Sequence, residues 1–143
     1  MRLLVDAAPL VAQVEPENSL REAAMQVLLR ERELPILSPL TAAEADYLCQ
    51  RRAGPRGNLR LITDLAAGRF EVPHLAASDF AQVETLNNRY RELNAGMADL
   101  SIVVLAARYN TTRILTFDHR HFRLITPLHG GTFTLLPFDE PAS

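Results

Sequence analysis

Hydrophobic residues follow two patterns along this chain, short apolar runs and longer stretches with helical spacing. Four runs have the length and the β-branched or leucine content of strands, namely 2–5, 34–38, 69–73 and 113–117. Stretches with apolar residues three and four apart predict helices over about 18–32, 40–52, 56–67, 78–91 and 100–107, and Pro9 suits the first turn of a short helix. Strands that are separated by helices favour a parallel sheet flanked by helices on both faces, which is an α/β fold.

The end of the chain departs from this alternation. Segments 123–126 and 132–136 flank His129, Gly130 and Gly131, which favours a hairpin or an addition at the sheet edge. At 143 residues the chain is expected to form a single domain over 1–138, followed by a frayed tail over 139–143.

The central stretch is 97–122, which reads MADLSIVVLAARYNTTRILTFDHRHF. Its part from Leu100 to Ala107 is apolar on nearly every side, which predicts a buried helix with Asp99 in the opening turn. The following strand ends at Asp118, and the strand near the start of the chain ends at Asp6. In parallel sheets, ligands bind beyond the carboxyl ends of the strands, so we expect these acids at one edge.

A fourth acid, Glu44, lies on the predicted helix over 40–52. Tyr47 and Leu48 follow one turn later, which predicts that Glu44 lies on the buried face. Asp46 is about 200° further around the helix and is expected in solvent.

Clustered carboxylates raise one another's pKa, so they favour a bound cation. Oxygen ligands select hard cations such as Mg²⁺ or Mn²⁺, which act on phosphate substrates by polarising a phosphoryl oxygen and activating water. Each acid also has a simpler explanation. Asp6 and Asp118 can be turn residues, Asp99 can stabilise a helix dipole, and Glu44 can be an exposed helix residue.

Composition excludes several kinds of chemistry. All fifteen basic residues are arginines, and the absence of lysine excludes a P-loop and Schiff-base catalysis. The single Cys49 and the lack of zinc spacing exclude an internal disulfide and disfavour zinc, and they point to the cytoplasm. The net charge of −2 gives no overall attraction to nucleic acid, so RNA contacts need local patches. No apolar run approaches the roughly 18 residues that span a membrane.

The chain resembles the PIN-domain ribonucleases, and among them the toxins of VapBC-type toxin–antitoxin pairs. The likeness spans nearly the whole length and is carried by LLVDAAPLVA, PLTAAEADYLC, LNAGMADLSIVVLAARY, TRILTFDHRHFRLI and FTLLP. The resemblance implies a metal-dependent endoribonuclease that uses Mg²⁺ or Mn²⁺, with Asp6, Glu44, Asp99 and Asp118 as the metal-site acids. It also implies a homodimer held inactive by an antitoxin whose C-terminal segment lies over the acidic groove.

One position departs from the family pattern. The family usually has Thr or Ser after the first acid, where this chain has Ala7 and Ala8. Thr116, two residues before Asp118, is a candidate to supply the missing hydroxyl from outside the metal ligands.

Residues with candidate RNA contacts follow the last acid. They are His119, Arg120 and Arg123, with His121 among them, and they can equally form a solvated turn. Apolar surface on the short helix near Pro9 and on the helix from Ser19 is expected to be covered by an antitoxin or by a second copy of the chain.

Two other functions fit parts of the pattern. A PIN-fold module that binds RNA or protein without cleaving it is kept open by Ala7 and Ala8. A receiver or phosphatase domain would use a strand-end aspartate as phosphoacceptor. Such sites have a second acid beside the first and usually a lysine, and neither is present.

Overall fold

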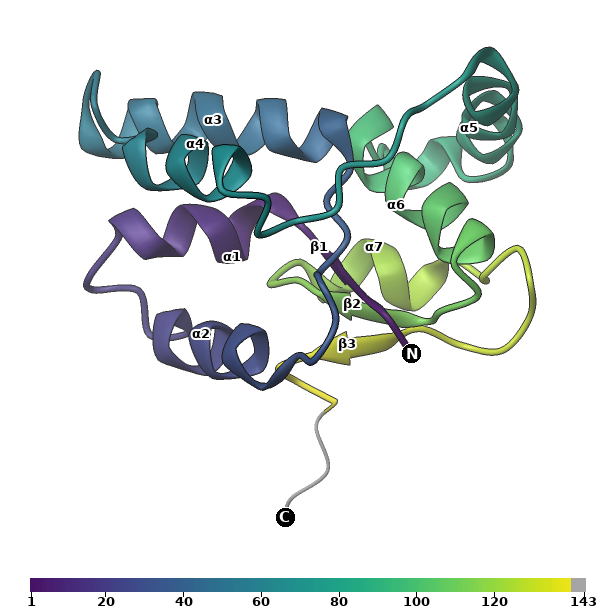
Figure 1. Cartoon of the computed structure of the whole chain (residues 1–143). Coiled ribbons are helices and arrows are strands. Elements are labelled where there is room, and N and C mark those ends of the chain that lie inside the picture. Colours follow the sequence, from purple (N-terminus) through teal and green to yellow (C-terminus); the bar gives the residue numbers. More distant parts are fainter. Residues whose placement is uncertain (140–143) are drawn as a thin grey trace.

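The computed structural model describes residues 1–139, which fold around a parallel sheet (Figure 1). Its strands are β1 (Leu3–Val5), β2 (Arg113–Leu115) and β3 (Thr134–Leu136), in the order β1-β2-β3. In the register, Leu4 lies beside Ile114, and Ile114 lies beside Leu135. The α/β expectation with a parallel central sheet is therefore confirmed.

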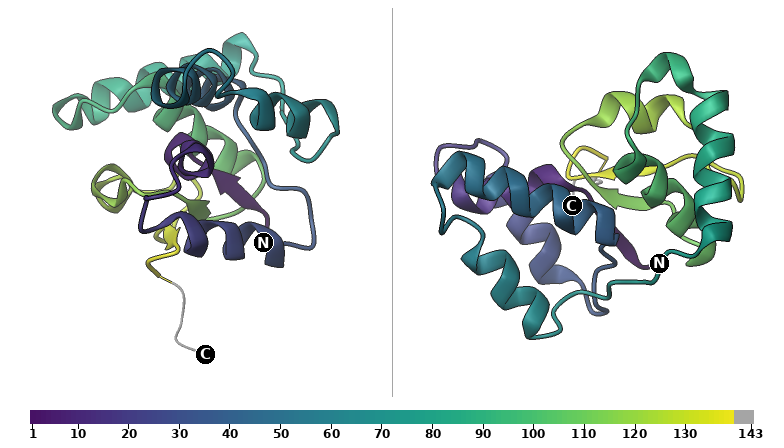
Figure 2. Two further views of the ribbon diagram at one scale, coloured as in Figure 1. Left: turned by 90° about the vertical axis from the view of Figure 1, so that its left-hand side faces the viewer. Right: turned by 90° about the horizontal axis from the view of Figure 1, so that it is seen from above.

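Helices cover both faces of this sheet (Figures 1 and 2). Among the described residues they are α1 (Ala7–Val11), α2 (Arg21–Arg30), α3 (Pro39–Ala53), α4 (Leu59–Ala66), α5 (Ala77–Arg89), α6 (Met97–Arg108) and α7 (His119–Leu124), with 3-10 turns at Ala12–Val14 and Arg91–Leu93. Seen from above in Figure 2, α1 to α4 lie on one side of β1, and α5 to α7 lie on the other. None of the helices in the described part of the chain is long and apolar enough to cross a bilayer.

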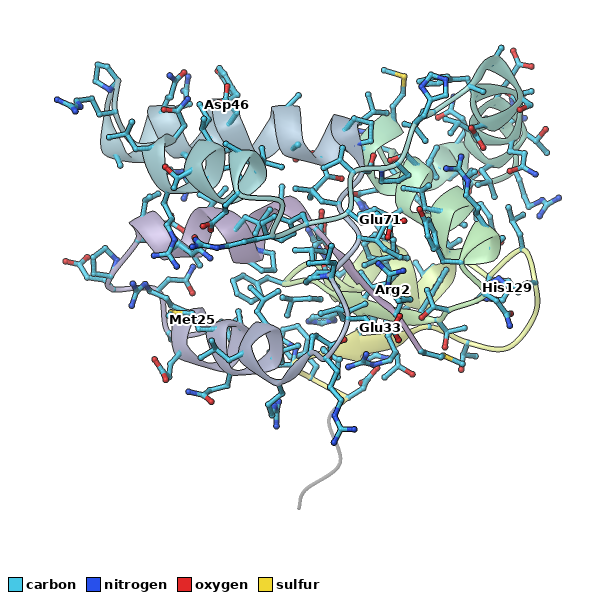
Figure 3. The ribbon with its side chains drawn as sticks, viewed as in Figure 1. Arg2, Met25, Glu33, Asp46, Glu71 and His129 are labelled. Atoms are coloured by element: carbon cyan, nitrogen blue, oxygen red, sulfur yellow. The ribbon has the colours of Figure 1, made fainter. Side chains whose placement is uncertain are left out.

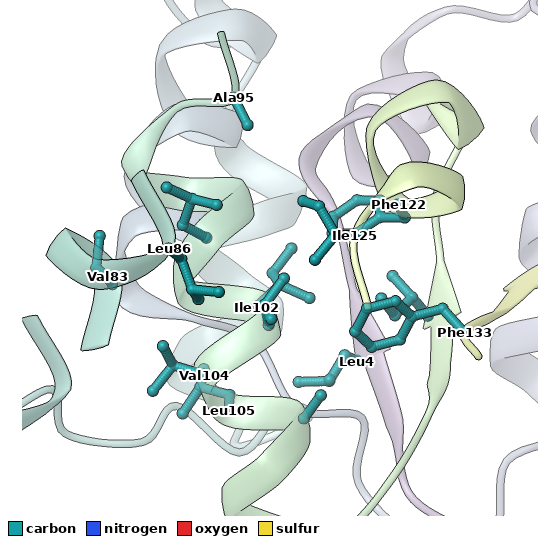
Figure 4. Close-up of a cluster of buried hydrophobic side chains, with 14 of the residues drawn as sticks. Leu4, Val83, Leu86, Ala95, Ile102, Val104, Leu105, Phe122, Ile125 and Phe133 are labelled. Atoms are coloured by element: carbon teal, nitrogen blue, oxygen red, sulfur yellow. The ribbon is translucent and has the colours of Figure 1, made fainter. Parts of the chain in front are cut away.

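Two hydrophobic clusters result from the alternation of side chains along the strands. One cluster joins Leu4, Ile114 and Leu135 to α5, α6 and α7 (Figure 4). The other joins the alternate strand residues, among them Leu3 and Leu115, to α1, α2, α3 and α4. Helix α6 is buried at every position from Leu100 to Ala106, as its apolar sequence predicts.

Charged groups gather at the amino end of β1, opposite the end that leads to Asp6. Arg2 donates to Glu71 Oε1 at 2.9 Å and to the carbonyl of Leu34 at 2.7 Å, and it lies 3.6 Å from Glu33 (Figure 3). This cluster fixes the amino end of β1 and so helps to hold the whole strand, including its carboxyl end, in position.

Two of the predicted strands are reduced to single bridges. Ile36 pairs with Leu4 and with Glu71, but neither 34–38 nor 69–73 forms a longer strand. Pro35 has no N–H to donate, and Ser38 already caps α3 by accepting from the N–H of Leu40. The ladder therefore stops after one residue on each segment.

Of the two alternatives predicted for 123–136, the hairpin is wrong and the addition at the sheet edge is confirmed, because β3 is the edge strand beside β2. His119–Leu124 is helix α7, and β3 pairs parallel to β2 after a connection that contains Gly130 and Gly131 at positive φ. Asp118 caps this helix by accepting from the N–H of Arg120, and Phe122 packs inside the first cluster. The local cap and the buried ring together favour a helix over a strand.

The ends of other segments also differ from the expectation. Helix α2 begins at Arg21 after a turn in which Asn18 accepts from Leu20, so Ser19 does not cap it. Helix α5 begins at Ala77, with the Asp79 carboxylate accepting from Ala76. Asp139, the first residue of the expected tail, is hydrogen-bonded to Leu135, and the rest of that tail, 140–143, lies outside the described residues.

Replacing Phe122 by Ala should destabilise the fold by about 3–5 kcal/mol, because the ring is 1% exposed and packs edge-on against Phe133. Urea unfolding measures this loss. Leu124→Ala on the exposed side of α7 is the control and should cost well under 1 kcal/mol. Equal losses in the two variants would contradict the packing described for α7.

Candidate active site

The four candidate acids come from four different elements. Two of them follow the carboxyl ends of β1 and β2, and two lie on helices. Asp6 follows β1 and caps α1, while Asp118 follows β2 and caps α7. Asp99 stands in the first turn of α6, and Glu44 stands in the middle of α3. Asp6 is buried, Asp99 and Asp118 are half-buried, and Glu44 is exposed.

Asp6 is held by two hydrogen bonds. Its Oδ1 accepts from the N–H of Ala7 at 2.8 Å, and its Oδ2 accepts from the hydroxyl of Thr116 at 2.7 Å. The same hydroxyl oxygen accepts from the N–H of Asp118 at 3.0 Å. Thr116 therefore links the first acid to the last across neighbouring strands, and the hydroxyl that Ala7 and Ala8 lack reaches Asp6 from β2's side of the sheet.

Burial raises the pKa of Asp6 from its ordinary 3.8 to about 6, and the negative charges of Asp99 and Glu44 add to the rise. Burial also raises the pKa of Asp99, with a smaller contribution from Asp118, and burial together with Asp99 raises the pKa of Glu44. Each of the four acids is therefore in an electrostatic interaction with at least one of the others. Their side chains come from four separate elements.

His121 lies between two of the acids. Its Nδ1 is 3.2 Å from Asp99 Oδ2 and 3.6 Å from Asp118 Oδ2, and it opposes the rise in the pKa of Asp99. From the sequence, His121 was grouped with the candidate RNA contacts and was assigned no contact with the acids. Its spacing of three residues from Asp118, which caps α7, is the signal that could have located it.

The face of α3 was predicted incorrectly. Its buried stripe is Thr41, Ala45 and Cys49, whereas Glu44 is exposed and Tyr47 is 58% exposed. Asp46 was expected in solvent but is half-buried and accepts a hydrogen bond from Asn58. Glu44 stands beside the buried stripe, about 100° around the helix from Ala45. Glu44 therefore interacts electrostatically with Asp99 from an exposed position.

A layer of hydroxyl groups lies under Glu44 and Asp99 and was not predicted. Ser38 Oγ is 2.7 Å from Ser101 Oγ, which donates to the carbonyl of Ala98 at 2.6 Å. These bonds join the start of α3 to the first turns of α6, and so they set the separation of the two helices that carry Glu44 and Asp99. The Thr41 hydroxyl is buried nearby on α3 and has no hydrogen-bond partner among the described residues.

The three candidate RNA-contact residues differ in their surroundings. Arg120 is largely exposed, and its nearest acid is Asp118 at 3.6 Å. Arg123 forms a two-bond ion pair with Asp139, and His119 stacks edge-on against Phe138 with ring centres 4.9 Å apart. Arg120 is therefore the residue of this set whose charge faces the acids and solvent.

The donor set fits a hard cation that keeps much of its water. No three His, Cys, Asp or Glu side chains within residues 1–139 are close enough together to hold an ion by themselves. Mg²⁺ normally binds through one or two protein carboxylates, with waters and substrate phosphate completing its shell. The oxygen-only set of mutually repelling acids has the charge that such an ion would neutralise.

Comparison with known proteins identifies the family. The family model for the PIN domain matches residues 3–126. The chain belongs to the PIN-domain family. Ribonuclease VapC26 of Mycobacterium tuberculosis is 33% identical over 135 residues, which cover 94% of this chain and 100% of that protein.

Two solved structures share the fold. The crystal structure of Mycobacterium tuberculosis VapC20, a sarcin-ricin loop cleaving toxin, has a TM-score of 0.75 at 17% identity and covers 82% of this chain and 91% of its own. A toxin–antitoxin complex from Klebsiella pneumoniae has a TM-score of 0.64 at 17% identity, with 86% and 92% covered. This PIN-domain chain therefore has the architecture of VapC toxins.

The repulsion at Asp6 predicts that Asp6→Asn raises the melting temperature of the metal-free protein at pH 7.5 by a few degrees, corresponding to about 1 kcal/mol. The amide removes the buried charge but still accepts from Ala7, and the Thr116 hydroxyl can accept from it in turn. Because the folded pKa is raised, the stabilising contribution of neutral Asp6 is complete below about pH 4 and is lost as the pH rises through about 6.

Thermal unfolding in EDTA between pH 4 and 8 measures this effect, and Asp6→Asn should remove that part of the pH dependence. Excess Mg²⁺ or Mn²⁺ should narrow or reverse the difference in melting temperature between Asp6→Asn and the wild type, since a bound ion stabilises the wild type. Glu84→Gln, an exposed change on α5, is the matched charge control. A loss of stability in Asp6→Asn that metal does not alter would show that these acids share no cation.

Proposed function

We propose that this PIN-domain protein is a metal-dependent endoribonuclease that acts as the toxin of a toxin–antitoxin pair. The observation that carries the proposal is the geometry of the acids, since His121 Nδ1 lies 3.2 Å from Asp99 and 3.6 Å from Asp118. The Thr116 hydroxyl ties the buried Asp6 to the backbone of Asp118. Buried acids that repel one another are costly to a fold. Their cost is explained if a divalent cation and an RNA phosphate meet at this point.

In this proposal Asp6, Glu44, Asp99 and Asp118 hold Mg²⁺ or Mn²⁺. The ion would polarise a phosphoryl oxygen and lower the pKa of an attacking water. The protein's own residues orient the ligands. Ala7 and Thr116 fix both oxygens of Asp6, and His121 holds Asp99 beside Asp118.

A PIN-fold module that binds without cleaving is the second candidate. It is favoured by Ala7 and Ala8, which carry no hydroxyl beside the first acid. The hydrogen bond from Thr116 to Asp6 supplies that hydroxyl from another strand and so supports the nuclease. Groups that orient metal ligands can change metal affinity or activity by 10–100-fold, so Thr116 is a positioning residue in the proposal.

We further propose that the antitoxin covers an apolar groove between the 3-10 turn Ala12–Val14, α2 and α4. The groove has a volume of about 190 Å³, and its apolar wall includes Leu28, Leu29, Phe70 and Met25. Figure 3 labels Met25 on α2. Leu29 is 73% exposed. Arg60 and Arg69 stand at its polar end and share the single buried acid Asp64, which leaves that end positive. An apolar segment with an acidic residue fits this surface. The Klebsiella pneumoniae neighbour is a toxin–antitoxin complex.

Asp99→Asn should abolish RNA cleavage while leaving the fold intact, because the change removes a charge and almost no volume. Gel analysis of a radiolabelled RNA pool with Mg²⁺ or Mn²⁺ measures cleavage, which EDTA should stop. Asp6→Asn and Asp118→Asn should behave alike, and Glu44→Gln should lose less because Glu44 is exposed. Cleavage retained by folded Asp99→Asn would remove this residue from the mechanism, whereas Glu84→Gln should cut normally.

Leu29→Arg should abolish co-purification with the product of the neighbouring reading frame, because it places a charge in the apolar groove. Phe80→Arg, at an apolar site on α5 that is 37% exposed and outside the groove, is the control and should leave the pair intact. We also propose a homodimer. Light scattering on the chain alone distinguishes an antitoxin from a second copy of the chain as the occupant of the groove. If Leu29→Arg breaks the dimer, the groove binds a second copy, which contradicts the antitoxin proposal.

A further inference from the structure

A hollow of about 340 Å³ is bounded on one side by Asp118, and none of the other three acids lines it. Its walls are Ala8 in the first turn of α1, Phe117 after β2, and Asp118, His119 and Arg120 at the start of α7. This volume is within the range of about 300–1,000 Å³ that is typical of ligand pockets. The hollow is therefore large enough for a flat ring and is open to the side on which substrate would approach.

Aromatic rings border the hollow. Phe117 is half-buried, so part of its ring remains accessible, and its other side packs into the second cluster. The His119 ring is exposed but is supported by Phe138, whose ring meets it at an interplanar angle of 69°. Exposed rings that are fixed by neighbours are suited to stacking with a nucleobase, because they lose little freedom on binding.

The small side chain of Ala8 keeps the hollow open. Ala8 contributes only a methyl group at the wall formed by α1, where most residue types would extend into the space. The alanine at this position therefore has a structural consequence besides the missing hydroxyl.

The cations near the hollow are not equivalent. Arg120 points its charge into solvent with Asp118 as its nearest acid, whereas both terminal nitrogens of Arg123 bind Asp139. If the phosphate to be cleaved lies at the acids, the adjacent phosphate of the RNA backbone would lie within reach of Arg120. Arg123 is already neutralised by its partner and contributes little new attraction.

We propose that this hollow binds one unstacked base of single-stranded RNA, next to the phosphate that is cleaved. His119 and Phe117 provide the stacking surface, and Arg120 contacts a flanking phosphate. The inference rests on the proposed function for the position of the scissile phosphate, and it extends that function to a specific subsite. Its substrate class is RNA with an unpaired nucleotide at the cut, such as a loop or an end.

Binding and cleavage test the subsite separately. Fluorescence anisotropy of a fluorescein-labelled single-stranded oligoribonucleotide, in EDTA and low salt, measures binding without cleavage. His119→Ala and Ala8→Leu should each weaken binding roughly 5- to 150-fold, the range expected for one stacked base. Ala81→Leu, an equal enlargement at an exposed site on α5, should bind as the wild type does.

Salt dependence tests the phosphate contact. The slope of log affinity against log salt should fall by about 0.7 in Arg120→Gln, the value for one phosphate of a single strand, and should stay unchanged in Arg123→Gln. An equal change in both variants would overturn the assignment of Arg120.

Cleavage in Mg²⁺ completes the test and separates the two proposals. With the same oligoribonucleotide, His119→Ala and Ala8→Leu should raise KM with a smaller change in kcat. An abasic nucleotide beside the cut should slow the wild type but not Ala8→Leu. Normal cleavage and binding by Ala8→Leu would overturn the subsite and leave the nuclease intact. Base-dependent binding without any cleavage by the wild type would overturn the nuclease and leave a base-binding pocket.

Discussion

Electrostatic repulsion at the end of β1 is the constraint on which the site depends. Asp6 is 6% exposed, and its pKa is raised to about 6 by burial and by the charges of Asp99 and Glu44. Two local features oppose this cost. Asp6 and Asp118 each cap a helix, and a capping side chain typically contributes about 0.5–2 kcal/mol. The acids therefore also serve the local structure, which keeps them in place when no cation neutralises them.

The two hydrophobic clusters explain how four separate elements can hold these acids together. Helix α6 belongs to one cluster and α3 to the other, so Asp99 and Glu44 approach from opposite sides of the sheet. The bond between Ser38 and Ser101 joins these two helices near their starts. The site thus lies on the boundary between the clusters, and both must be well packed for the acids to remain close despite their repulsion.

Residues that follow strands were the part of the site that the sequence predicted best. A short apolar run that ends in an aspartate places Asp6 and Asp118 at one edge without any knowledge of long-range contacts. The face of Glu44 was predicted incorrectly because Tyr47 was taken as buried, and only the packing of α3 shows that Thr41, Ala45 and Cys49 form the stripe. Helix α7 was missed because its local cap, Asp118, is also a common turn residue and because the burial of Phe122 depends on tertiary contacts. The pairing of Arg123 with Asp139 joins residues far apart in sequence, so no local pattern reveals it.

Thr116 connects the departure at Ala7 and Ala8 to the geometry of the whole site. A hydroxyl beside the first acid would orient Asp6 from α1, but here the same contact comes from the segment that follows β2. This arrangement ties Asp6 to the backbone of Asp118, so the two hydrogen bonds hold both acids in a fixed relative position. It also leaves only a methyl group at Ala8, next to the hollow beside Asp118. Because Thr116 supplies the hydroxyl that orients Asp6, positions 7 and 8 need not carry one, and the methyl group of Ala8 is compatible with the open space beside it.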